Sequence, residues 1–156
     1  MSTEEYERIA KTYADIVYRV ALSYSKSEQD AEDVLQNTFL KLLVHEPAFK
    51  DEEHLRRWLI RVAVNQCNTL WNSFWRKNVD SIDNTTDEPA FESKDYSELY
   101  QAIRTLPAKY RIVVHLFYYE GYSTKEISSI LHILEATVRS RLAYARKLLK
   151  QQLKEA

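Results

Sequence analysis

The stretch from Ser123 to Leu149 contains side chains that could contact a nucleic acid. One helical face of its second half combines small residues, a hydroxyl and an aromatic ring, with guanidinium groups on the flanks. These residues are Ala136, Arg139, Ser140, Arg141, Ala143, Tyr144 and Lys147. Base edges offer hydrogen-bonding groups and backbone phosphates attract cations, so this pattern suits a helix that lies in the DNA major groove.

The apolar residues of the same stretch predict two helices that would position these side chains. The first helix has an apolar stripe at spacing i, i+3, i+4, and the second has one at i, i+4, i+7, i+11. The stripes are Ile127, Ile130 and Leu131, then Val138, Leu142, Ala145 and Leu149. The turn at residues 132–134 is short, as in a helix-turn-helix. An ordinary amphipathic hairpin with a solvated basic face has the same pattern, so this stretch alone leaves both interpretations open.

A second candidate site lies on a helix predicted from about Glu53 to Trp75. Aromatic rings beside cations are what single-stranded nucleic acid requires, because unstacked bases need flat partners and the backbone needs countercharge. The residues of this kind are Arg56, Arg57, Trp58, Arg61, Asn65, Trp71, Phe74, Trp75, Arg76 and Lys77. Trp58 fits a core position equally well. Trp71 and Trp75, one turn apart near a basic end, fit the nucleic-acid interpretation better.

Further helices are predicted at Glu4–Tyr24, Glu28–Val44, Leu99–Leu106 and Ala108–Glu120. Ser27 is a plausible N-cap for the second, which we expect Pro47 to close, and Pro107 suits the start of the fourth. Gly121 should cap that fourth helix. A single glycine and three prolines leave little material for the turns of a β protein. The expected fold class is therefore all-α.

The charge distribution divides the chain into three parts. Residues 1–78 have eleven Lys and Arg against twelve Asp and Glu, residues 79–98 have one against seven, and residues 99–156 have ten against four. The acidic stretch shows little apolar periodicity, which predicts a flexible linker between two small helical domains, at 1–78 and 99–156. Because the net charge is only −1, we expect weak DNA binding without a larger partner.

Several function classes are excluded by what the sequence lacks. Cys67 is the only cysteine, so an internal disulfide and a multi-cysteine zinc site are excluded. The four histidines have no HExxH spacing, and one glycine cannot build a glycine-rich phosphate loop. We expect no enzyme activity, no metal and no cofactor. The acidic N-terminus and the short apolar runs predict neither a signal peptide nor a membrane span, which indicates a cytoplasmic protein.

Three segments of the chain resemble a bacterial RNA polymerase sigma factor. They are DAEDVLQNTFLKL at Asp30–Leu42, HLRRWLIRVAVNQCNTL at His54–Leu70, and LPAKYRIVVHLFYYEGYSTKEISSIL followed by EATVRSRLAYARKLLK within Leu106–Lys150. The order of the segments and the two-domain length are similar to the extracytoplasmic-function (ECF) group. The resemblance covers nearly the whole chain except the linker.

The resemblance implies a transcription initiation factor that binds core RNA polymerase, directs it to promoter DNA and helps melt the −10 element. It implies that the polymerase binds the helix bearing Asp33, Gln36 and Asn37, and that the loop at Phe49 and Lys50 pockets a flipped −10 base. The adjoining −10 contacts would be Arg61, Asn65, Trp71, Trp75, Arg76 and Lys77. The −35 element would be read by Arg139, Ser140, Ala143 and Tyr144.

Some positions depart from the family pattern, and one other function class stays open. His132 stands where the turn often has Gly or Asn, Leu134 replaces the usual Ser or Thr N-cap, and Tyr144 stands where Arg is common. An anti-sigma factor is a further candidate partner. The alternative function is a stand-alone helix-turn-helix transcriptional regulator, which should dimerise and bind duplex DNA without polymerase.

Overall fold

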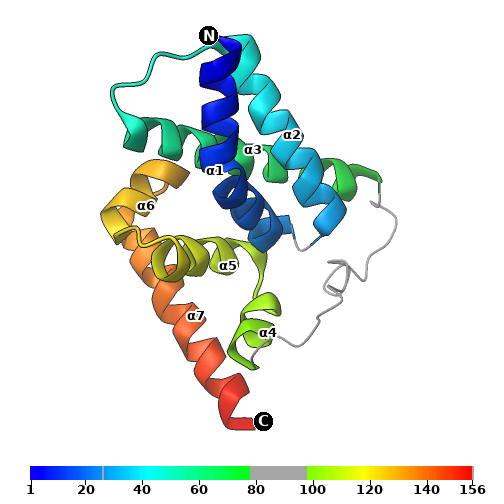
Figure 1. The fold of residues 1–156 in the computed structure, drawn as a ribbon. Coiled ribbons are helices and arrows are strands. Elements are labelled where there is room, and N and C mark those ends of the chain that lie inside the picture. Colours follow the sequence, from blue (N-terminus) through cyan, green and yellow to red (C-terminus); the bar gives the residue numbers. More distant parts are fainter. Residues whose placement is uncertain (26, 78–97, 156) are drawn as a thin grey trace. The chain divides into compact units, whose positions relative to one another are not determined.

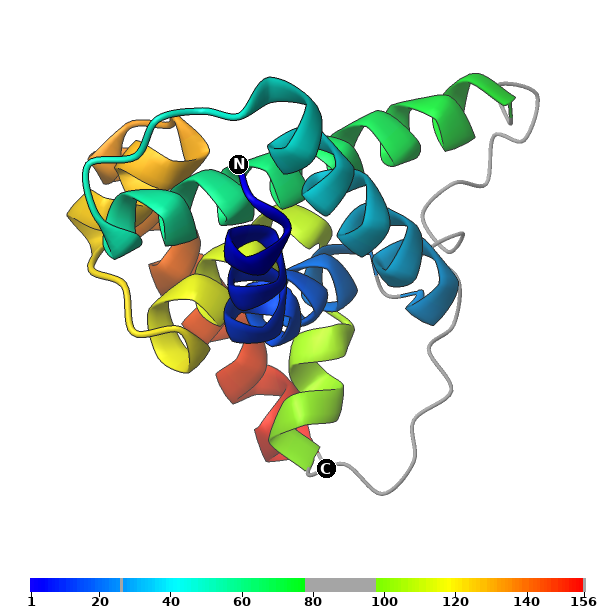
Figure 2. The ribbon, with the colours of Figure 1, turned by 45° about the horizontal axis from the view of Figure 1, so that its top comes forward.

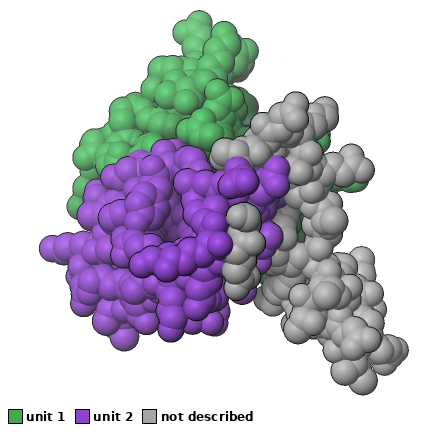
Figure 3. Space-filling view, turned by 90° about the horizontal axis from the view of Figure 1, so that it is seen from below, with its two compact units in different colours: residues 1–89 green, residues 90–156 purple. Residues whose placement is uncertain are grey.

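The computed structural model describes residues 1–25, 27–77 and 98–155, and the regular elements within these ranges are all helices. The chain forms two compact units, residues 1–89 and 90–156 (Figures 1 and 3). The predicted all-α class with two helical domains is confirmed. The predicted linker at 79–98 lies outside the described residues except for Glu98, so its boundaries and its flexibility remain predictions.

The first unit is a three-helix bundle of α1 (Thr3–Ser25), α2 (Glu28–His45) and α3 (Glu52–Lys77). Each helix packs against the other two, and α3 crosses the α1–α2 pair (Figures 1 and 2). All three contribute apolar side chains that are nearly inaccessible to solvent: Ile9, Ile16, Val17, Val20, Ala31, Val34, Leu42, Leu55, Leu59, Ile60 and Ala63. Burial of such side chains is the main force that holds the bundle together.

The ends of α2 show one expected and one unexpected cap. The Asp30 amide donates to Ser27 Oγ at 3.2 Å, so Ser27 is the N-cap that the sequence predicts. At its C-terminal end, α2 stops at His45, before Pro47. Glu46 adopts a left-handed conformation with φ 43°, and its amide donates to the Leu42 carbonyl at 3.0 Å. Such a cap is usually glycine, so the sequence does not reveal it.

Helical spacing predicts a buried stripe on α2 made of Ala31, Val34, Leu35, Thr38 and Leu42, and the structure differs from this prediction at two positions. Leu35 is only partly buried, whereas Phe39, which the apolar pattern did not single out, is 7% exposed. The reason is an aromatic contact with α1: the rings of Phe39 and Tyr6 meet edge to face, with 6.4 Å between their centres. The buried stripe of α2 therefore includes Phe39 in place of Leu35.

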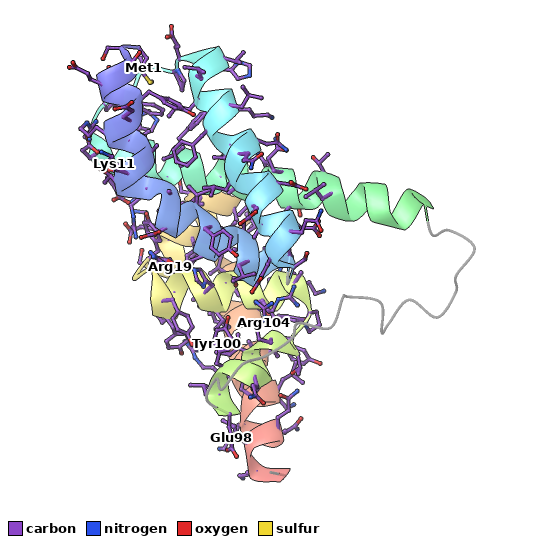
Figure 4. All side chains as sticks on the ribbon, turned by 45° about the vertical axis from the view of Figure 1, so that its right-hand side comes forward. Met1, Lys11, Arg19, Glu98, Tyr100 and Arg104 are labelled. Atoms are coloured by element: carbon purple, nitrogen blue, oxygen red, sulfur yellow. The ribbon has the colours of Figure 1, made fainter. Side chains whose placement is uncertain are left out.

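The second unit is organised around its last helix. It comprises α4 (Glu98–Arg104), α5 (Ala108–Val114), the π-helix η2 (His115–Tyr119), α6 (Thr124–Leu131) and α7 (Glu135–Glu155). Helix α7 packs against α4, α5 and α6. On α4, the guanidinium carbon of Arg104 lies 5.9 Å from the centre of the Tyr100 ring, and Figure 4 labels both side chains.

The predicted helix from Ala108 to Glu120 is not uniform. It is α-helical only to Val114 and then widens into a π-helical turn, with the Glu120 amide donating to the His115 carbonyl at 3.1 Å. The same turn brings His115 Nε2 to 2.7 Å from a carboxylate oxygen of Glu120, whose side chain is 3% exposed. Apolar periodicity does not reveal this change, because it records only which face of a helix is buried.

Candidate nucleic-acid interface

Local hydrogen bonds define the helix-turn-helix formed by α6 and α7. Ser123 and Glu126 form a capping box: the Glu126 amide donates to Ser123 Oγ at 3.1 Å, and the Ser123 amide donates to Glu126 Oε1 at 2.9 Å. This arrangement fixes the start of α6. At its end, His132 takes a left-handed conformation with φ 56°, and α7 begins three residues later at Glu135.

The two apolar stripes predicted for this motif face its interior except at Leu131 and Leu149, which are only partly buried. Ile127 and Ile130 of α6 are buried, as are Val138, Leu142 and Ala145 of α7. The outer side of α7 exposes all four residues assigned to −35 binding: Arg139, Ser140, Ala143 and Tyr144. The structure therefore brings these four residues together on one exposed helical surface, which we call the α7 outer face.

A second exposed surface is formed by α3 and the loop before it. Trp58, Arg61 and Asn65 are spaced i, i+3, i+7 and so share one face of α3, where Asn65 is exposed and the other two are partly exposed. The Phe49 ring reaches this face, with 5.6 Å between its centre and that of Trp58. Phe49 thus adjoins Arg61 and Asn65 through Trp58, and Lys50 follows Phe49 in the chain. We call these five residues the α3 face.

Hydrogen bonds at the start of α3 hold the Phe49 loop in place. Asp51 is an N-cap that the sequence analysis missed: its Oδ1 accepts the His54 amide at 2.7 Å. His54 Nδ1 in turn accepts the Lys50 amide at 3.1 Å, and its ring meets Phe49 edge to face at 5.4 Å. Phe49 is consequently a partly buried residue with two aromatic neighbours.

The remaining residues assigned to −10 binding lie at the end of α3. The helix extends to Lys77, two residues beyond the predicted end at Trp75, so the backbone of Trp71, Trp75, Arg76 and Lys77 is helical. Their side chains lie outside the described residues. Their proposed contribution rests on the sequence.

The third candidate surface is the outer side of α2. Asp33, Gln36 and Asn37 are exposed, as predicted, and so are Glu32 and Lys41. Beside them, α1 and α2 enclose a groove of about 540 Å³ that is lined by Tyr6, Ala10, Ala14, Leu35, Gln36, Asn37, Phe39 and Leu40. Leu40, Leu43 and Val44 extend this surface as exposed apolar side chains that the sequence analysis missed. The sequence could have revealed them, because they are apolar residues that lie outside the buried stripe of α2.

The described parts of the chain contain neither a cluster of metal-binding side chains nor a candidate membrane span. Within residues 1–25, 27–77 and 98–155, no three His, Cys, Asp or Glu side chains gather closely enough to hold a metal ion. No helix in those ranges combines the length and the apolar character that a membrane span requires.

Comparisons with known proteins account for both units. The family model for sigma-70 region 2 matches residues 9–77, and that for sigma-70 region 4 matches residues 96–149. The chain is 32% identical over 151 residues to the ECF RNA polymerase sigma factor SigL of Mycobacterium tuberculosis, covering 92% of this chain and 85% of that protein. It is 31% identical to SigM of Bacillus subtilis, covering 92% of both. The chain belongs to the ECF RNA polymerase sigma factors.

Solved structures agree with this assignment. The sigma factor RpoE of Bartonella quintana, solved in complex with the anti-sigma factor NepR, matches with a TM-score of 0.80 and 25% identity over 97% of this chain and 98% of that one. CnrH, solved with the cytosolic domain of CnrY, shares the fold at a TM-score of 0.70 and 20% identity, over 99% of this chain and 90% of its own.

As a sigma factor, the protein acts in promoter-specific initiation of transcription with RNA polymerase. The predicted function is therefore confirmed, and the stand-alone helix-turn-helix regulator is not favoured. The α3 face lies within the segment that matches region 2, and the α7 outer face lies within the segment that matches region 4.

Proposed function

We propose that this sigma factor binds core RNA polymerase through the outer side of α2. The observation that supports this assignment is the combination of charge, amides and apolar surface there. Asp33, Gln36 and Asn37 are exposed beside the α1–α2 groove and the exposed Leu40. Protein interfaces commonly surround a desolvated apolar centre with a polar rim, which this surface could provide.

We further propose that the other two surfaces bind the promoter. The α7 outer face would enter the major groove of the −35 element, where Arg139 and Ser140 can hydrogen-bond to base edges and Ala143 permits close approach. The α3 face would hold the −10 element and help to melt it, with Phe49 stacking on one unpaired base and Lys50 and Arg61 pairing with the backbone. Trp71, Trp75, Arg76 and Lys77 would extend this contact.

Three further points complete the proposal. The protein would act in the cytoplasm, where transcription takes place. It would contribute binding energy and no reaction of its own, since the chemistry of transcription belongs to the polymerase. Because RpoE and CnrH are described in complexes with an anti-sigma factor and with a cytosolic domain, respectively, an anti-sigma factor is also proposed as a partner of this chain.

The experiment that tests polymerase binding is charge reversal on α2. The double variant Asp33→Lys, Gln36→Ala removes a negative charge and an amide from two exposed positions, so the helix should still fold. Pull-down of purified core polymerase should fall at least tenfold, which corresponds to about 1.4 kcal/mol of binding free energy. Circular dichroism should match that of the wild type.

The matched control is Asp15→Lys, which reverses an exposed charge on α1. Helical spacing places Asp15 on the side of α1 opposite the buried stripe, away from the groove residues Tyr6, Ala10 and Ala14. The control should bind core polymerase like the wild type. Normal binding by the folded double variant would refute the assignment of α2 as the docking surface.

A further inference from the structure

Three side chains from two helices form an exposed cluster at one flank of the α7 outer face. The Tyr144 ring of α7 lies against the Tyr110 ring of α5, with 5.0 Å between their centres and 45° between their planes. Above Tyr110, Lys109 Nζ lies 5.2 Å from the centre of the ring. Lys109 comes from the first turn of α5, 35 residues before Tyr144 in the sequence.

The position of Tyr144 makes this cluster continuous with the α7 outer face. Tyr144 follows Ser140 by one helical turn and adjoins Ala143, and all three are exposed. Its own side chain is 45% exposed. Lys109 is also exposed, and Tyr110 is partly buried between the lysine and Tyr144. An ammonium group over an aromatic ring is attracted to the face of that ring, which reduces its freedom of movement.

The next arginine of α7 is engaged elsewhere. Arg146 Nε donates to the hydroxyl of Tyr118 at 2.7 Å, and its guanidinium carbon lies 5.7 Å from the centre of that ring and 5.8 Å from that of Phe117. Arg146 and Tyr144 are two residues apart and therefore project to different sides of α7. Arg141 and Lys147 of α7 lie one turn from Tyr144, and Lys109 adds a positive charge from α5 to the same flank.

We propose that Lys109 binds a backbone phosphate of the −35 duplex and that the Tyr110–Tyr144 pair positions it. The inference rests on the proposed insertion of the α7 outer face into the major groove. A helix in that groove lies between two phosphate walls, and neighbouring helices commonly contact them. Such contacts fix the register of the protein on the duplex and do not discriminate among bases. Lys109 would therefore raise affinity equally for all sequences.

The test measures the salt dependence of duplex binding by the holoenzyme. The probe is a fluorescently labelled duplex selected from a promoter library by the wild-type holoenzyme. The slope of log affinity against log salt concentration is negative, and loss of one phosphate contact should make it less steep by about 0.9. When the salt concentration rises from about 50 to 200 mM, binding by both proteins weakens. The fold-loss of affinity should be about three- to fourfold smaller for Lys109→Ala than for the wild type. Base preference at the −35 element should stay the same.

Companion variants separate charge from packing. Lys109→Arg keeps the cation and should restore the wild-type slope. Tyr110→Phe keeps the ring under Lys109 and should also keep the wild-type slope, whereas Tyr110→Ala should reproduce most of the slope change of Lys109→Ala. Lys154→Ala removes an exposed lysine near the end of α7 and should leave the slope unchanged. A purely structural role for Lys109 would lower the melting temperature without altering the slope.

Arg139→Ala is measured in the same series to distinguish two kinds of failure. If Arg139→Ala weakens binding while Lys109→Ala keeps the wild-type affinity and slope, the role of Lys109 is refuted and the α7 assignment stands. If neither variant differs from the wild type, the proposed −35 role of α7 is itself refuted, and the inference about Lys109 is refuted with it.

Discussion

The Tyr13 hydroxyl donates to Glu52 Oε2 at 2.5 Å and thereby joins the middle of α1 to the first turn of α3. Arg8 adds an ion pair to the same carboxylate at 3.1 Å. The hydrogen bond from Tyr13 and the contacts with Arg8 lower the pKa of Glu52 below 4.5. Burial, followed by the bond to Glu52, raises the pKa of Tyr13 to about 12.

These shifts predict how the stability of the first unit depends on pH. Because the pKa of Glu52 is lower in the folded state, its contribution is present above the unfolded-state pKa and is lost as the pH falls through the folded-state value. The pKa of Tyr13 is raised, so its contribution is present below about pH 10 and is lost as the pH rises through about 12. The pair should therefore stabilise the bundle throughout the neutral range.

Tyr13→Phe should lower the free energy of unfolding by about 1–2 kcal/mol near pH 7, because a hydrogen bond to a charged group is lost. Urea unfolding at an acidic pH below the folded-state pKa of Glu52 should show a smaller loss, because the acceptor is then protonated. The control is Tyr24→Phe, since the Tyr24 hydroxyl donates at 2.5 Å to the Asn68 amide oxygen, which does not titrate. An equal loss for Tyr13→Phe at both pH values would contradict the charged-acceptor account.

The left-handed residue that ends α6 predicts a stabilising substitution. His132 has φ 56°, a conformation that costs a non-glycine residue about 1–2 kcal/mol. Glycine avoids this cost, but it loses more conformational entropy on folding, which offsets part of the gain. His132→Gly should therefore raise the free energy of unfolding by about 0.5–1 kcal/mol. Thermal unfolding of the intact protein would measure it.

Gly121→Ala is the matched opposite substitution. Gly121 has φ 77°, and a Cβ there would meet no heavy atom within 4 Å, so only backbone strain would change. It should lower stability by about 1 kcal/mol. A destabilising His132→Gly, or a neutral Gly121→Ala, would show that backbone strain does not dominate at these turns.

Phe49 should affect both stability and promoter choice. Its ring contacts Trp58 and His54 but remains partly exposed, so Phe49→Ala should lower the free energy of unfolding by about 1–2 kcal/mol, less than a fully buried Phe would. It should also relax base discrimination at one −10 position in holoenzyme binding. Phe49→Leu separates the effects: it should restore stability but not discrimination, because leucine cannot stack on a base. Recovery of both would make Phe49 a packing residue only.

Arg139 offers the sharpest test of base recognition. It pairs with Glu135 one turn earlier at 3.0 Å, and both side chains are substantially exposed. Such a pair contributes only about 0.3–0.5 kcal/mol, so DNA can replace it readily. Arg139→Ala should cost about 1–3 kcal/mol in holoenzyme binding and relax the preference at one −35 base. A uniform loss across a −35 library, with a salt slope lower by about one, would instead indicate a phosphate contact.

The sequence predicts most of the helices because their buried residues recur at helical spacing. It also predicts the cap at Ser27, since serine is a residue type that such caps prefer. For α6 the sequence leaves Ser123 and Thr124 open as the start, and the structure shows that Ser123 is the cap. The caps at Glu46 and His132 could not be predicted, because neither is glycine. The contacts of Tyr110 with Tyr144 and of Phe39 with Tyr6 could not be predicted either. Each joins residues more than 30 positions apart, and a spacing pattern records only residues on the same helix.

We propose that the two units of one chain read two promoter elements for RNA polymerase. Run-off transcription from a promoter library, with core polymerase and the full-length protein, measures this directly. We predict transcripts only when the protein is present, from templates that share two sequence elements. Arg139→Ala should alter selection in the upstream element alone, and Phe49→Ala in the downstream element alone. Transcripts without shared elements, or identical selection by the wild type and both variants, would contradict the account.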